Sequence, residues 1–223
     1  PFYVSSAKVP DMQRGFDPSE FQNRLDRVQS LMAGAGLDAL VLTTETDVRY
    51  FTGFLTRFWE SPTRPWFLVV PQTGMPVAVI PSIGAALMRK TWITDIRTWS
   101  APDLTDDGVT LLADTIRQVV GAGARIGVPD GHGTHLRMPL QDYQRVQDLL
   151  PQATFTSDQR IIETLRRIKS GAELAKIERA CTIAGRAFDR VCEIAGAGVP
   201  LDRVFRDFQS LCLAEGADWV PYL

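Results

Sequence analysis

The sequence has few of the residues from which a metal or thiol centre is built. Its 223 residues include two histidines and three cysteines. Cys181, Cys192 and Cys212 form an odd number without Cys-x-x-Cys spacing, which argues against a disulfide framework and against a zinc site. A nucleophilic thiol would need a histidine partner, and both histidines are distant in sequence. We interpret the three cysteines as reduced residues that pack within helices.

An excess of charge of either sign is also missing. Lysine and arginine number 24 against 26 aspartates and glutamates, so the surface has no net field that would attract nucleic acid or anionic lipid. The longest uncharged run, residues 65–88, is interrupted by four prolines and two glycines, which favours short strands over a membrane-spanning helix. No basic segment followed by an apolar core begins the sequence. We therefore expect a cytoplasmic protein that binds neither nucleic acid nor membranes.

Up to about residue 157, the apolar pattern predicts alternating helices and strands. Residues 17–20, Asp-Pro-Ser-Glu, are a typical helix start, and short apolar runs between turn residues predict strands. A Gly-containing turn joins two of these runs into a hairpin. The expected helices cover about 18–34, 106–120 and 136–150, and the expected strands 38–43, 66–70, 76–80, 95–99, 125–128 and 153–156. This order predicts an α/β domain, residues 1–157, whose mixed sheet carries helices on both faces.

Helical patterns replace strand patterns after residue 157. Apolar residues recur at intervals of three and four over 171–195, and a second stripe covers 201–212, so each helix is expected to bury one face. Only the run 219–223 remains to cover those faces, which predicts that residues 158–223 are the incomplete start of a second, α+β domain. The alternative is that the two helices pack on the first domain or on a second copy of the chain.

Two motifs resemble those of one enzyme family. Asp47-Val-Arg-Tyr-Phe-Thr-Gly53 resembles the Asn/Asp-x-x-Tyr-x-Thr/Ser-Gly turn of the creatinase/prolidase amino-terminal domain. Residues 165–180 are similar to the Arg-x-x-Lys-Ser-x-x-Glu segment that opens the pita-bread metallopeptidase domain of creatinase, prolidase and aminopeptidase P. The segment 198–217 is similar to the next helix of that domain. The resemblance therefore covers nearly the whole chain and implies that residues 158–223 begin a truncated pita-bread domain.

This resemblance implies a hydrolase of C–N bonds that works as a homodimer on a small peptide or on a small amide or amidine. The chemistry uses a pair of divalent metals (Mn, Zn or Co), or no metal in the creatinase branch. In relatives the ligands are two Asp, one His and two Glu, all located after the point where this sequence stops. No catalytic or metal-binding residue is therefore carried over, and we expect this chain to be inactive alone and to hold no metal. The alternative is a non-catalytic binding or assembly protein that retains only this half.

Residues 53–66 form the candidate substrate-binding loop. Arg57 and Arg64 offer guanidinium groups for a carboxylate, while Phe54 and Trp59 offer flat faces for an apolar or cationic group. The resemblance implies that this loop reaches the neighbouring subunit's active site, and Arg64 matches the arginine that binds the substrate carboxylate there. The alternative is that the aromatic residues border the core and the arginines are solvated.

Two further groups have simpler interpretations. His132 and His135 lie three residues apart in a Gly-rich loop without a nearby set of carboxylates, so we interpret them as polar loop residues and not as metal ligands. The basic residues Arg166, Arg167 and Lys169 fall at the expected domain junction. We interpret them as solvated or inter-domain charges.

Overall fold

In the computed structural model, which describes residues 14–61 and 64–220, the chain divides into two compact units. The larger unit is Gly15–Ile168, and the smaller unit contains the residues from Lys169 onward. This division lies later than the boundary that the sequence predicted after residue 157. The reason is helix α6 (Ile161–Arg167), which buries Ile161, Ile162 and Leu165 in the core of the larger unit.

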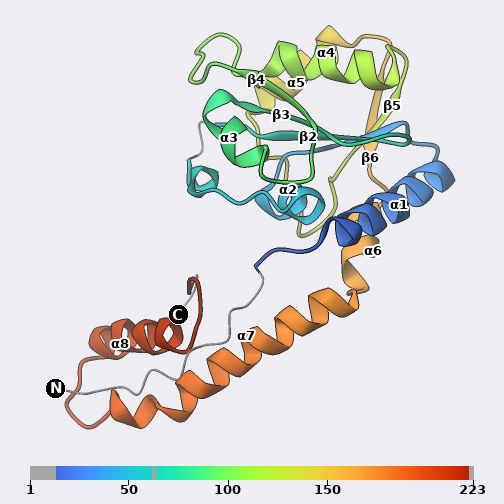
Figure 1. Cartoon of the computed structure of the whole chain (residues 1–223). Coiled ribbons are helices and arrows are strands. Elements are labelled where there is room, and N and C mark those ends of the chain that lie inside the picture. The colour runs from blue at the N-terminus through green and yellow to red at the C-terminus, as the bar shows by residue number, and fades with distance from the viewer. Residues whose placement is uncertain (1–13, 62–63, 221–223) are drawn as a thin grey trace. The chain divides into compact units, whose positions relative to one another are not determined.

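A six-stranded mixed sheet forms the centre of the larger unit (Figure 1). Its strands are β1 (Ala39–Leu42), β2 (Phe67–Pro71), β3 (Val77–Pro81), β4 (Asp95–Trp99), β5 (Arg125–Val128) and β6 (Thr154–Ser157). They lie in the order β4-β3-β2-β1-β5-β6, in which β2 pairs antiparallel with both neighbours and all other pairings are parallel. The predicted mixed α/β sheet and its hairpin are confirmed.

Helices cover both faces of this sheet, as the sequence predicted. One face carries α1 (Pro18–Ala35), α2 (Glu45–Thr52), α3 (Ala85–Met88) and α6, and the other carries α4 (Val109–Val120) and α5 (Leu140–Leu149). Figure 1 shows α4 and α5 above the sheet and α1 and α2 below it. Because apolar cores lie against both faces, every residue of β1, β2 and β3 is buried, which explains why these strands read as continuous apolar runs.

Three local expectations were wrong. Residues 47–53 are not a simple turn, because α2 includes them up to Thr52 and ends at Gly53, which has the left-handed φ of 76°. Helix α5 begins at Leu140 and not near 136, since Pro139 disfavours helical geometry in the residue before it. Helix α4 begins at Val109 and not near residue 106, because Gly108 precedes it with a left-handed φ of 87°.

The two motifs on which the family resemblance was based contact each other within the larger unit. The guanidinium of Arg166, on α6, donates to the buried carboxylate of Asp47, on α2, over 2.8 Å. The Thr44 hydroxyl donates to the other oxygen of the same carboxylate over 2.7 Å and caps α2 by accepting from the Asp47 N–H. Arg166 is therefore tied to the first sheet domain and is not simply solvated.

Helices α7 (Gly171–Asp189) and α8 (Leu201–Ala214) form the smaller unit, with a short 3-10 turn, η3 (Val191–Glu193), between them. A capping box begins α7, because the Ser170 hydroxyl accepts from the Glu173 N–H and the Glu173 carboxylate accepts from the Ser170 N–H. Helix α7 ends at Asp189 and not near 195. Arg190 follows it and forms ion pairs with Glu193 and Glu215, which raise the pKa of its guanidinium.

The apolar faces of α7 and α8 are covered only in part within the described residues, as the sequence predicted for an incomplete domain. The small core between the helices contains Ala187, Phe208, Leu211 and Cys212, while Phe188 is 63% and Leu201 is 66% exposed. All three cysteines are free, but only Cys212 is buried, whereas Cys181 and Cys192 are exposed. None of the helices in the described ranges is both long enough and apolar enough to cross a membrane.

Candidate functional site

Two distant loops meet at the carboxyl end of strand β1. Since β2 runs antiparallel to β1, the loop before β2 lies at the end where β1 finishes. Since β5 runs parallel to β1, the loop after β5 leads to the same end. The sheet order therefore brings residues 53–61 and 64–66 beside residues 129–139, a placement that resembles the edge of a parallel sheet where ligands commonly bind.

Arg137 joins these two loops. Its guanidinium donates to the backbone carbonyls of Arg64, over 2.8 Å, and Trp59, over 2.9 Å, and also to that of Ser61. It also lies over the Trp59 ring, 5.1 Å from the centroid. The backbone N–H of Arg137 donates to the Thr43 hydroxyl over 2.8 Å, directly after β1. One side chain thus holds the carbonyls of Trp59, Ser61 and Arg64 near the end of the sheet.

The electrostatics of this contact favour a tight hold. Arg137 is half-buried, and this desolvation lowers the pKa of its guanidinium, while the carboxylate of Glu45 acts in the opposite direction. A cation in such a position needs compensating acceptors, which the three carbonyls supply. Each hydrogen bond to a charged group contributes about 1.5 to 3 kcal/mol in typical cases, so the three bonds together attach this loop firmly to Arg137.

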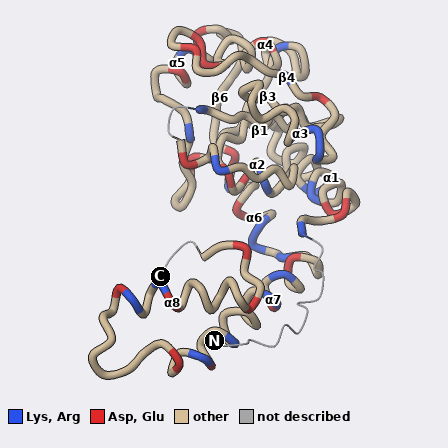
Figure 2. Tube along the Cα trace, turned by 60° about the vertical axis from the view of Figure 1, so that its left-hand side comes forward, with Lys and Arg blue, Asp and Glu red and all other residues tan. Residues whose placement is uncertain are grey.

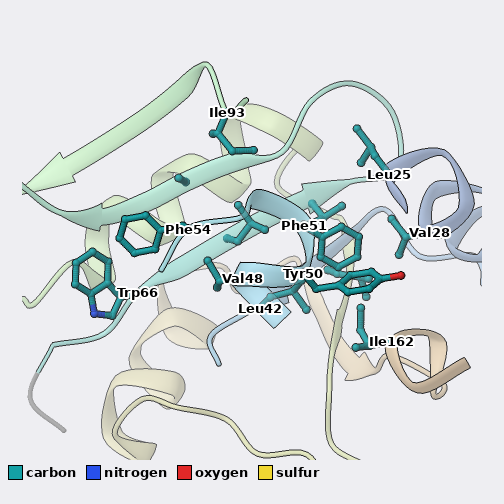
Figure 3. Packing of buried hydrophobic residues seen from close by; sticks show 14 of the residues in the cluster. Leu25, Val28, Leu42, Val48, Tyr50, Phe51, Phe54, Trp66, Ile93 and Ile162 are labelled. Atoms are coloured by element: carbon teal, nitrogen blue, oxygen red, sulfur yellow. The ribbon is translucent and has the colours of Figure 1, made fainter. Parts of the chain in front are cut away.

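Phe54 and Trp59 lie in the core of the larger unit. Phe54 is 1% and Trp59 is 6% exposed, and both pack against the fully buried Trp66 with ring centroids 5.3 and 5.7 Å apart. Figure 3 shows Phe54 beside Trp66 at one end of this core. These two aromatic residues therefore form the floor under the loop, and neither face is open to a ligand in this conformation.

The two predicted arginines lie in different surroundings. Arg57 is exposed on η1 (Arg57–Glu60) and forms an ion pair with Glu60 over 2.9 Å. Arg64 is half-buried, and its guanidinium lies 4.9 Å from the centroid of the Phe58 ring. Within the described residues no carboxylate forms an ion pair with Arg64. The structure therefore places one predicted cation, Arg64, where a carboxylate from outside could pair with it.

Carboxylates gather at the neighbouring ends of β5 and β6. The buried Asp158 accepts hydrogen bonds from the backbone N–H groups of Arg160 and Ile162 and so caps α6. Burial raises the pKa of Asp158, the two cap bonds lower it, and the nearby charges of Asp130 and Asp47 raise it further. The Ser157 hydroxyl donates to Asp130 over 2.7 Å. The two bonds to Asp158 therefore stabilise the start of α6.

The residues present do not fit a dinuclear metal centre. In the described parts of the chain, no three His, Cys, Asp or Glu side chains lie together in a way that could hold a metal ion. His132 and His135 are both exposed in the loop that precedes α5. The described residues therefore supply no ligand set to which a metal-dependent step could be assigned.

Sequence reasoning missed Arg137. The residue lies 73 positions from Arg64, and neither composition nor periodicity connects the two. A signal was nevertheless available, because the expected strands 38–43 and 125–128 could have been predicted to lie parallel, with the loops after them at one edge. What the sequence could not supply was the pairing of the strand at 66–70 with the strand at 38–43.

Comparison with known proteins places this arrangement in a family. The family described as the creatinase/prolidase N-terminal domain matches residues 24–168. The chain is 25% identical over 190 residues to an uncharacterized hydrolase/peptidase of Sinorhizobium fredii, covering 82% of this chain and 47% of that protein. It is 27% identical over 188 residues to a creatinase of a Bacillus species, covering 83% and 43%.

Solved structures give the same picture. A dipeptidase, PepE, from Mycobacterium ulcerans matches with a TM-score of 0.73 and 26% identity, covering 93% of this chain and 53% of that one. A prolidase from Thermococcus sibiricus shares the fold, with a TM-score of 0.76 at 20% identity and the same two coverages. The chain thus spans about half the length of the relatives that it matches.

Proposed function

Since this chain belongs to the creatinase/prolidase N-terminal domain family, we propose that it forms the amino-terminal part of a hydrolase that cleaves C–N bonds. The family match confirms the resemblance drawn from the two sequence motifs. Relatives named as dipeptidase, prolidase and creatinase support a small substrate, either a short peptide or a small amide or amidine. The whole protein would carry the metal pair, Mn, Zn or Co, or would work without metal as in the creatinase branch.

The smaller unit supports the proposal that a further part of the fold follows. Helices α7 and α8 expose apolar side chains that a complete domain would cover, among them Phe188 and Leu201, and Trp219 after α8 is half-exposed. Exposed apolar area of this kind marks an interaction surface. We propose that the remainder of a pita-bread domain packs on it, and that the units divide as amino-terminal domain and opening segment of the catalytic domain.

Arg64 carries the proposed role of the larger unit. Its backbone carbonyl accepts from Arg137 near the carboxyl end of β1, and its guanidinium lies over the ring of Phe58 without an ion pair to any described carboxylate. A planar guanidinium can bind a carboxylate through two parallel hydrogen bonds. We propose that Arg64 binds the substrate carboxylate of a neighbouring subunit in a cytoplasmic homodimer, with Arg57 and the aromatic floor of Phe54 and Trp59 supporting the loop.

Steady-state kinetics of the full-length protein test this role. Arg64→Ala should raise KM for the carboxylate-bearing substrate by about tenfold or more, the scale of one lost charged contact. The KM of Arg64→Lys should lie between those of wild type and Arg64→Ala, because an ammonium group keeps the charge but not the planar fork. The matched control is Arg89→Ala, which removes the same charge from an exposed position after α3. An unchanged KM in Arg64→Ala would remove Arg64 from the site.

Mixed dimers test whether Arg64 acts across subunits. Subunits carrying Arg64→Ala are mixed with subunits inactivated in the catalytic half. If Arg64 serves its neighbour, one of the two sites in each mixed dimer receives both an intact catalytic half and an intact Arg64, so activity with the wild-type KM reappears. If Arg64 serves its own subunit, mixing leaves KM at the Arg64→Ala value. A full-length protein that has neither turnover nor bound metal would instead favour a binding or assembly protein.

A further inference from the structure

We propose that Arg137 is a positioning residue that holds residues 53–61 and 64–66 in the shape that presents Arg64 to the substrate. The inference rests on the proposed function of Arg64, and it assigns to Arg137 no contact with the substrate itself. Its basis is a juxtaposition that the sheet creates: the loop before β2 and the loop after β5 meet at the end of β1.

The contacts of Arg137 are concentrated on the segment that carries Arg64. The carbonyls of Trp59 and Ser61 accept from one terminal nitrogen, and the carbonyl of Arg64 accepts from the other. Two of the three acceptors therefore precede Arg64 and the third belongs to Arg64 itself. A movement of this backbone that displaced the Arg64 side chain would break at least one of these bonds.

The other end of Arg137 is anchored to the rigid sheet. Its backbone N–H donates to the hydroxyl of Thr43, which is buried directly after β1, and helix α5 begins three residues later at Leu140. The guanidinium also packs over the buried Trp59 ring. Arg137 is thus bonded both to the end of the sheet and to the loop, so it can fix the loop relative to the sheet.

Arginine suits this task better than lysine. Its guanidinium has five N–H donors in a fixed planar fork, and here two separate terminal nitrogens donate to the three carbonyls. The ammonium of lysine has three donors, but they all lie on one nitrogen and do not reproduce this fork. The guanidinium is half-buried, and partial burial raises the cost of leaving a polar group there without a partner.

The test uses the full-length protein with the variants Arg137→Ala, Arg137→Lys, Arg64→Ala and the double variant of Arg64 and Arg137 to alanine. Arg137→Ala is expected to raise KM by about tenfold with a much smaller change in kcat, and Arg137→Lys to restore only part of the loss. In the Arg64→Ala background, Arg137→Ala should add less than about twofold, since both changes remove the same interaction. The control is Arg145→Ala, which removes a cation of α5 that donates to Thr105.

Backbone hydrogen exchange provides a readout that does not depend on activity. In Arg137→Ala, the amides of residues 55–61, Arg64 and Trp66 should exchange at least about tenfold faster, while those of β1 and β5 keep their wild-type rates. Equal acceleration in β1 and β5 would mean a general structural role and would overturn the inference. So would a wild-type KM in Arg137→Ala when Arg64→Ala raises KM.

The proposed function and this inference can fail separately. If Arg64→Ala leaves KM unchanged, the proposed function of Arg64 fails, and the exchange experiment still decides whether Arg137 holds the loop. If Arg64→Ala raises KM but the double variant shows the product of two independent losses, Arg137 acts elsewhere and the positioning role is overturned.

Discussion

Replacing Gly84 with alanine should damage the aromatic floor beneath the candidate loop. Gly84 ends the 3-10 turn η2 (Ser82–Gly84) after β3 and is buried. A Cβ atom at this position would lie 2.2 Å from Cζ3 and 2.6 Å from Cη2 of Trp66. Carbon atoms in contact normally lie about 3.5 to 4.0 Å apart, so the indole ring would have to move by more than about 1 Å.

The Trp66 ring has no room for such a movement. It is fully buried and packs against Phe54 and Trp59, whose rings lie 5.3 and 5.7 Å away. Overpacking of this kind costs about 1 to 3 kcal/mol, while the stiffer unfolded chain of an alanine variant returns only about 0.4 to 1 kcal/mol. We therefore expect Gly84→Ala to lower the free energy of unfolding by about 1 to 2 kcal/mol, which corresponds to a Tm lower by roughly 2 to 8 °C for a unit of this size.

Thermal and urea denaturation, followed by circular dichroism and tryptophan fluorescence, measure this effect. The matched control is Gly34→Ala in α1, where a Cβ atom meets no neighbour within 4 Å and where alanine should stabilise the helix by about 0.5 to 1 kcal/mol. Adding Trp66→Phe removes the ring atoms that clash, so the two changes together should cost at least about 1 kcal/mol less than the sum of their separate costs. A Gly84→Ala protein as stable as the Gly34→Ala control, or strictly additive effects, would refute the reasoning.

Two smaller predictions concern the ends of helices. Ser170→Ala should cost α7 about 1 kcal/mol of local stability, because it removes the acceptor for the Glu173 N–H; exchange of the first-turn amides measures this, and Ser170→Asp should restore it. Asp130→Asn should move the titration of Asp158 to lower pH, since one of the charges that raise its pKa is removed. A raised folded-state pKa means that Asp158 stabilises the fold most below its usual pKa of 3.8 and that this contribution is lost as the pH rises through the raised value. As the pH rises from 3.8 through the raised pKa of Asp158, the free energy of unfolding of the variant should therefore increase relative to that of wild type. Carboxyl carbon NMR follows the titration of Asp158, and an unmoved midpoint would contradict the role given to the Asp130 charge.

The sequence alone was sufficient for the features that depend on near neighbours. The strands at 95–99 and 125–128 have the bounds that their apolar patterns predicted, and the β2–β3 hairpin follows from its turn residues. Charge balance was equally readable, and Figure 2 shows acidic and basic residues interspersed along the trace of both units. Periodicity and turn chemistry depend on residues close in sequence, so they can be read without knowledge of the fold.

Tertiary structure alone decided which distant residues form the site. The burial of Phe54 and Trp59, the attachment of α6 to the larger unit, and the hold of Arg137 on the Arg64 loop all depend on the strand order. The physical reason is that the pattern of apolar residues tells which face of a strand is buried but not which strand lies beside it. That choice comes from the packing of the whole domain, and it places Arg137 next to a loop more than seventy residues away in the chain.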